Sequence, residues 1–146
     1  MLIKQEVQKI MQQFFLNKCE ESMLLYEVAK NGDFLLDKPI IVPEKALKST
    51  AERVGVDVRF IIYCMNNLAE AGKGMALIHN HFNNLVFSEQ DLVTIDKILD
   101  VAVKRGLSSI SFLIFENSSS KVVLKHFQLN AETDKYVETE ESICYE

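Results

Sequence analysis

Two of the three histidines in the sequence, His79 and His81, lie one residue apart at the end of a short apolar run. If that run forms a strand, both imidazoles point to the same face of a sheet and can converge on one point. Ser88 and Asp91 follow with the Ser-x-x-Asp spacing of a helix start, from which the carboxylate can point back to the strand end. Two imidazoles and one carboxylate make a three-ligand zinc site whose fourth position is open for water, as in catalytic zinc sites.

The same residues also have a purely structural interpretation. Ser88 is a good helix N-cap, and acidic residues in the first turn lie near the positive end of the helix dipole. A His-x-His pair is a weak signal on its own, and imidazole and carboxylate also suit divalent metals other than zinc. The third histidine, His126, falls in a predicted strand, where we expect it to be structural or exposed. The spacing alone therefore leaves metal binding and helix capping open.

The elements that must position these residues follow from hydrophobic periodicity and turn signals. Helices are predicted over residues 3–17, from Pro43 to Gly55, from Asp57 to Ala71, and from Ser88 to just before Gly106. Strands are predicted over residues 23–30, 34–42, 75–78, 110–115 and 121–128, with hairpin turns at residues 31–32 and 117–120. This order is typical of a mixed α/β fold, in which helices flank one mixed sheet.

Length and composition restrict the class of protein. The 146 residues are 48% hydrophobic and 25% charged, which is typical of one globular domain. The apolar runs are too short to cross a bilayer, and the first residues lack the pattern of a signal peptide. Three cysteines occur without a CxxC pair, as expected for reduced thiols in a cytoplasmic protein.

The charge is concentrated near the end of the chain. Residues 131–146 contain six acidic residues and one basic residue, whereas the other 130 residues are neutral overall. A neutral body offers no basic surface for a phosphate backbone, so nucleic acid is an unlikely ligand. We divide the sequence into a domain over residues 1–130 and an acidic tail over 131–146. The tail is expected to pack weakly, or to add a short element through Tyr136, Val137 or Ile143.

The histidine and serine motifs resemble those of a known family. Ile78–His81, followed by Ser88–Leu92, is similar to the His-x-His…Ser-x-x-Asp signature of the JAB/MPN metalloprotease (JAMM) family. The order of predicted elements from Ile3 to about Gln128 also resembles that fold, which has a cytidine-deaminase-like architecture. The resemblance covers most of the chain.

The resemblance implies a role for each residue of the motif. His79, His81 and Asp91 would bind Zn²⁺, and Ser88 would help to stabilise the tetrahedral intermediate. A glutamate upstream, where the first helix gives way to the first strand, would be the general base.

Three glutamates are candidates for that base. In the family the base typically stands four residues before a Leu-Leu-like pair, which here selects Glu20. Glu21 is the rival, because one residue of register changes the face to which a side chain points. Glu27, on the predicted strand itself, is the third candidate.

The resemblance implies a zinc-dependent peptidase or isopeptidase acting on a protein or peptide, as at the C-terminal tail of a ubiquitin-like modifier. Two alternatives stay open: a non-catalytic MPN-like interaction scaffold, and a relative of the DNA-repair-associated branch of the fold. Phe82 stands where the family usually has proline, and the following loop is about one residue shorter than the commonest family spacing. Both differences bear on the shape of the loop and so on the substrate.

Overall fold

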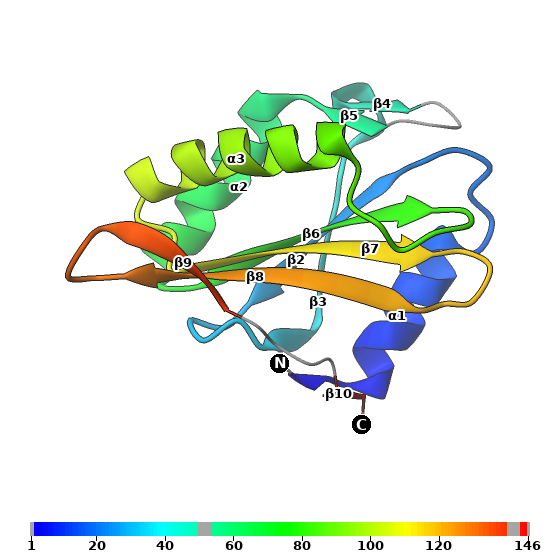
Figure 1. Ribbon diagram of the computed structural model, residues 1–146, viewed down its shortest axis with the longest axis horizontal. Helices are drawn as coiled ribbons and strands as arrows, with labels where there is room; N and C mark the ends of the chain where they lie inside the picture. The colour runs from blue at the N-terminus through cyan, green and yellow to red at the C-terminus, as the bar shows by residue number, and fades with distance from the viewer. Residues whose placement is uncertain (1, 50–53, 140–143, 146) are drawn as a thin grey trace.

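A mixed β-sheet forms the middle layer of the protein in the computed structural model, which describes residues 2–49, 54–139 and 144–145 (Figure 1). Within these ranges the sheet has six strands in the order β3-β2-β6-β7-β8-β9. The strands are β2 (Met23–Val28), β3 (Phe34–Ile41), β6 (Gly74–His81), β7 (Ser109–Glu116), β8 (Val122–Asn130) and β9 (Lys135–Thr139). The central pair β6–β7 is parallel, and the other neighbouring pairs are antiparallel. The predicted mixed α/β class is confirmed.

Helices cover both faces of this sheet. In the described part of the chain, α1 (Gln5–Phe15) packs on one face, and α2 (Val58–Glu70) and α3 (Glu89–Lys104) pack on the other (Figure 1). The buried side of α1 consists of residues spaced by four, namely Val7, Met11 and Phe15. None of the described helices is both long and apolar enough to cross a membrane.

The protein has one hydrophobic core on each face of the sheet, and side chains that alternate along β6 contribute to both. Ala76 and Ile78 pack with α1, whereas Met75 and Leu77 pack with α2 and α3. Because side chains alternate in a strand, continuing this pattern puts His79 and His81 on the α2/α3 face and the intervening residue on the α1 face. The sheet therefore separates two adjacent side-chain environments at the end of one strand.

The helix predicted between Pro43 and Gly55 is wrong. The structure has a single 3-10 turn, η1 (Glu44–Ala46), and then an antiparallel pair of short strands, β4 (Leu47–Ser49) and β5 (Val54–Val56). Pro43 does start a turn, because its carbonyl accepts a hydrogen bond from the Ala46 amide. The turn does not continue, since the two valines around Gly55 favour a strand and disfavour a helix. Residues 50–53 lie outside the described residues.

The acidic tail adds a strand, the second of the two expectations for it. β9 pairs with β8 at the edge of the sheet, and the Tyr136 hydroxyl donates a hydrogen bond to the Leu107 carbonyl at 2.6 Å. Burial raises the pKa of Tyr136 above its ordinary value. Farther on, β10 (Cys144–Tyr145) pairs in parallel with β1 (Leu2–Ile3). Ile143 lies outside the described residues.

Candidate metal centre

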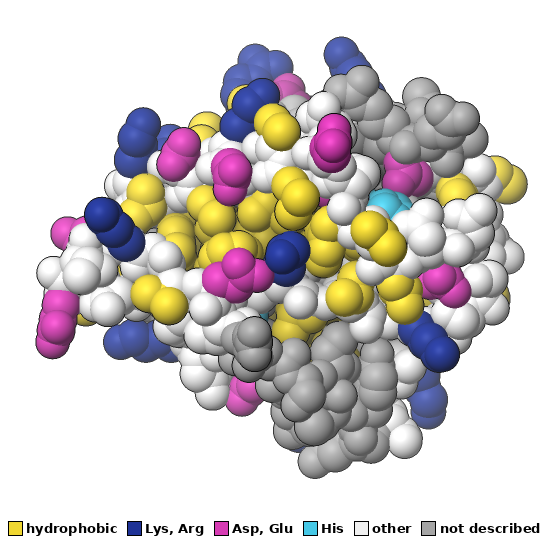
Figure 2. Space-filling model, in the orientation of Figure 1, with side chains coloured by type: hydrophobic (Ala, Val, Ile, Leu, Met, Phe, Trp, Pro, Cys, Tyr) yellow, Lys and Arg dark blue, Asp and Glu magenta, His cyan; other side chains and the backbone are white. Residues whose placement is uncertain are grey.

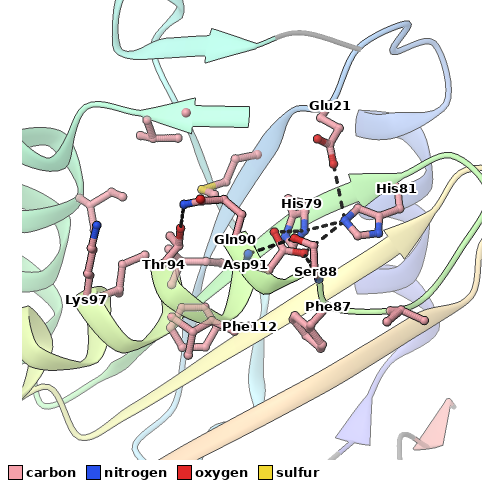
Figure 3. Close-up of a pocket in the computed structure, with 18 of the residues that line it drawn as sticks. Glu21, His79, His81, Phe87, Ser88, Gln90, Asp91, Thr94, Lys97 and Phe112 are labelled. Atoms are coloured by element: carbon pink, nitrogen blue, oxygen red, sulfur yellow. Dashed lines mark hydrogen bonds and ion pairs between the residues drawn. The ribbon is translucent and has the colours of Figure 1, made fainter. Parts of the chain in front are cut away.

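The two neighbouring histidines end β6 and face the α3 side of the sheet. Their Nε2 atoms lie 3.1 Å apart, and the side chains of His79 and His81 are 11% and 12% exposed. Figure 3 shows both rings directed toward the start of α3 and toward Glu21. The predicted convergence of the imidazoles is therefore present, and it follows from the two-residue repeat of the strand.

Asp91 approaches the histidines from the first turn of α3. One carboxylate oxygen lies 3.4 Å from His79 Nε2, and the other lies 3.5 Å from His81 Nε2. The same side chain closes a capping box: the Asp91 carboxylate accepts from the Ser88 amide at 2.9 Å, and the Ser88 hydroxyl oxygen accepts from the Asp91 amide at 3.0 Å. The capping and ligand interpretations are therefore compatible, because one carboxylate serves the helix start and faces both imidazoles.

Glu21 completes the group from the opposite side. Its carboxylate lies 3.5 Å from His81 Nε2, and the residue is 7% exposed. One possible ligand atom from each of Glu21, His79 and His81 lies within 4.8 Å of the others, so this group could hold a metal ion. Two imidazoles and two carboxylates thus meet where β6, α3 and the segment before β2 come together.

The structure brings Glu21, rather than Glu20, to the histidines. Glu20 is exposed and, unlike Glu21, is not among the residues that line the large cavity beside the histidines. Glu27 is directed elsewhere, because its carboxylate forms an ion pair with Lys73. The glutamate that faces a histidine ring is thus one residue after the position expected from the leucine pair.

Charge and burial act together on the pKa values of this group. A hydrogen bond with Asp91 is the main cause that raises the pKa of His81; burial opposes it, whereas Asn84 and the charge of Glu21 reinforce it. Burial works to raise the pKa of Asp91, but bonds from His79, His81 and the Ser88 amide outweigh it, so this pKa lies below its ordinary value. Both shifts indicate a site that favours a positive charge among carboxylates.

The candidate metal centre opens into a large cavity of about 1070 Å³. Its wall includes the apolar side chains of Met23, Leu77, Ile98 and Phe112. In Figure 3 the histidines lie at one end of the group of lining residues, and Lys97 lies at the other. Figure 2 shows apolar side chains gathered beside α3, with a histidine surface at their edge. The arrangement offers an apolar space directly beside a group of side chains that could hold a metal ion.

The third histidine lies in a different environment. His126 is 1% exposed, and its ring nitrogens face the Ser111 hydroxyl at 2.7 Å and the Gln128 side-chain oxygen at 3.2 Å. Ser111 is on β7, and Gln128 is on β8, the strand that also contains His126. This histidine joins the packing of the sheet and is not among the lining residues of the large cavity.

Comparison of the chain with models of protein families found no match, and comparison with curated proteins found none either.

Proposed function

We propose that the protein is a zinc-dependent amide hydrolase, a peptidase or isopeptidase of the JAMM type. The observation that carries the proposal is the meeting of two imidazoles and two carboxylates at one end of a large, mainly apolar cavity. In this proposal His79, His81 and Asp91 hold the ion. The donor set fits, because two neutral imidazoles and one carboxylate leave a position open for substrate or water.

Each remaining polar group has a task in the proposed reaction. When bound, zinc supplies hydroxide at neutral pH by lowering the pKa of water to about 7, and it polarises a carbonyl group. Glu21 accepts the proton of the attacking water and delivers it to the leaving amine as the C–N bond breaks. The water oxygen forms the new C–O bond, so the products are a carboxylic acid and an amine.

In this proposal Ser88 stabilises negative charge on the carbonyl oxygen. In the capping box its hydroxyl oxygen acts as the acceptor, which leaves the hydroxyl proton for a second bond. A donor at such a position is worth about 3 to 4 kcal/mol of transition-state stabilisation. The cavity wall excludes water from one side and favours an apolar portion of a peptide beside the bond that is cut.

Zinc binding is the first test of the proposal. Calorimetric titration of the purified chain with zinc should give one tight site, and a His79→Ala/His81→Ala double variant should lose it. His126→Gln is the control variant and should keep the site, because that ring lies in the packed sheet. One tight zinc site in the double variant would place the ion elsewhere.

Hydrolysis is the second test. Peptide amides and C-terminal fusions of ubiquitin-like proteins carrying a fluorogenic amine should be cleaved by the zinc-loaded chain. The double variant should show no cleavage. A chain that binds zinc but cleaves no member of such a panel would favour a binding role for the site.

A further inference from the structure

Asn80 lies between the two histidines but points to the opposite face of the sheet. It is fully buried, at 0% exposure, on the face of the sheet that packs against α1. The alternation along β6 makes this placement unavoidable once both imidazoles face α3. A buried amide carries two donors and one acceptor group that need partners, so its contacts define what it holds in place.

The Asn80 side chain contacts the backbone on both sides of Glu21. Its oxygen accepts a hydrogen bond from the Ser22 amide at 2.6 Å, and its nitrogen lies 3.5 Å from the Glu20 carbonyl as a long donor. These two groups belong to the residues immediately before and after Glu21. One side chain therefore restrains both peptide groups that determine the direction of the Glu21 side chain.

Asn117 holds the other side of the Asn80 amide. Its side-chain oxygen accepts from Asn80 at 2.9 Å, and its side-chain nitrogen donates to the Phe15 carbonyl near the end of α1 at 2.8 Å. Its backbone amide donates to the His81 carbonyl at 2.9 Å. The pair thus joins the end of α1, the segment before β2 and the end of β6.

We infer that Asn80, supported by Asn117, is a positioning residue that fixes Glu21 against the His79–His81 pair. Glu21 lies before the first residue of β2, so the ladder of the sheet does not by itself fix its backbone. The bonds to Asn80 supply that restraint from behind the sheet, while the flanking histidines face the cavity. The inference rests on the proposed function, since the site must use Glu21 beside a metal ion.

The test uses Co²⁺ alone as the probe, because its visible absorption reports both binding and coordination. Asn80→Ser should weaken Co²⁺ binding about tenfold and alter the absorption bands, the usual cost of losing an outer support of a metal site. Glu21→Gln should have a similar effect. In the Glu21→Gln background, Asn80→Ser should change Co²⁺ affinity by less than about twofold, because the group through which it acts is already removed.

Two further variants separate positioning from general stability. Ser111→Ala removes another buried hydrogen bond of the sheet, and it should lower the melting temperature without changing Co²⁺ affinity or absorption. Asn117→Ala alters a half-buried residue and should fold even if Asn80→Ser does not. It should weaken Co²⁺ binding by a smaller factor that also vanishes in the Glu21→Gln background.

Equal losses of Co²⁺ affinity with and without Glu21 would overturn the inference, as would unchanged affinity in Asn80→Ser and Asn117→Ala. In both cases the wild-type chain would still bind Co²⁺, and the proposed function would stand. A wild-type chain that bound neither Co²⁺ nor zinc would overturn the proposed function and, with it, this inference.

Discussion

The protein places its histidines in two environments on the same sheet, and burial does not distinguish them. His79 is 9% exposed and His126 is 1% exposed, so both are buried. Their partners differ: His79 and its neighbour His81 face two carboxylates at the end of a cavity, whereas His126 contacts a hydroxyl and an amide. The comparison shows that the charge of the partners and access to space, rather than burial, separate a candidate metal centre from a structural histidine.

The turn between β2 and β3 closes the space around His126. Gly32 has a φ of +96°, and a side chain at this position would place its Cβ 2.3 Å from the His126 ring. Only glycine fits both the left-handed backbone and the close approach of the ring. The imidazole thus packs beneath a tight turn, which leaves no room for an ion, whereas the β6 histidines face a cavity of about 1070 Å³.

The largest effect is expected at the glutamate that belongs to the β6 site. Glu21→Gln preserves the size of the side chain but removes the proposed base, and it should lower the rate of the proposed hydrolysis about 10²- to 10⁴-fold. Glu20→Gln is the matched control and should stay within about twofold, because Glu20 is exposed and does not line the large cavity. Steady-state rates on a fluorogenic amide would show this. A large loss in Glu20→Gln with none in Glu21→Gln would return the base to Glu20.

The next effect concerns the strand beside His126. Removing residues 131–146 deletes β9, whose Thr139 pairs with His126, and exposes the surface covered by Tyr136. The lost burial and hydrogen bond should lower the free energy of unfolding by about 3 kcal/mol. The affinity for zinc should be unchanged, because β9 supplies none of the groups around the β6 histidines. Urea unfolding and calorimetry would measure the two quantities; weaker zinc binding in a folded truncation would show that the two environments are coupled.

A smaller effect is expected from the bond that holds His126. Ser111→Ala leaves a buried ring nitrogen without its 2.7 Å partner, which should cost about 1 to 3 kcal/mol in the free energy of unfolding. Asn84→Ala removes the corresponding contact of His81, a 2.9 Å bond near the surface, and should cost less stability but weaken zinc binding. Urea unfolding and zinc titration of both variants would show this. The opposite pattern would contradict the division between a structural and a metal-binding region.

The smallest effect is a dependence of stability on pH that we expect from the β6 site. In the metal-free chain the raised pKa of His81 stabilises the fold fully below the unfolded value, about 6.5, and this stabilisation is lost as pH rises through the folded value. The lowered pKa of Asp91 stabilises the fold above about pH 4, and that contribution is lost on acidification. The free energy of unfolding should therefore fall modestly as the pH rises above about 6.5.

Zinc should reverse this trend, because it binds the neutral imidazole and its affinity rises with pH. Urea titrations at several pH values, with and without zinc, would measure both trends. Asp91→Asn is the control variant and should remove most of the pH dependence of the metal-free chain. The same dependence in Asp91→Asn would assign it to another group.

Local patterns predicted the part of the site that lies on single elements. The two histidines converge because a strand repeats every two residues, and Asp91 faces them because Ser88 caps the helix three residues earlier. The hairpin turn at Gly32 was predicted from the same kind of local signal. Such features depend on neighbours in the sequence, so the sequence alone contains them.

Contacts between distant residues decided what the sequence did not predict. Glu21, rather than Glu20, faces His81, and the adjacent Ser22 amide bonds to Asn80, 58 residues along the chain. The strand β9 depends on pairing with β8, although it lies in a tail whose acidic composition predicted weak packing. Pro43 predicted the start of a helix, but the chain forms a single 3-10 turn and then a strand in which Leu47 pairs with Val56. In each case tertiary pairing outweighed local preference.

The capping box of α3 also has a kinetic consequence. The Ser88 amide already holds the Asp91 carboxylate in the orientation that faces both imidazoles, so an arriving ion need not freeze a freely rotating side chain. The Asp91 side chain then loses little rotamer entropy when the ion binds. Conversely, the carboxylate swings away whenever the first turn of α3 frays. The residence time of an ion at β6 should therefore follow the opening rate of that turn, and amide hydrogen exchange at Ser88 should slow when the ion is present.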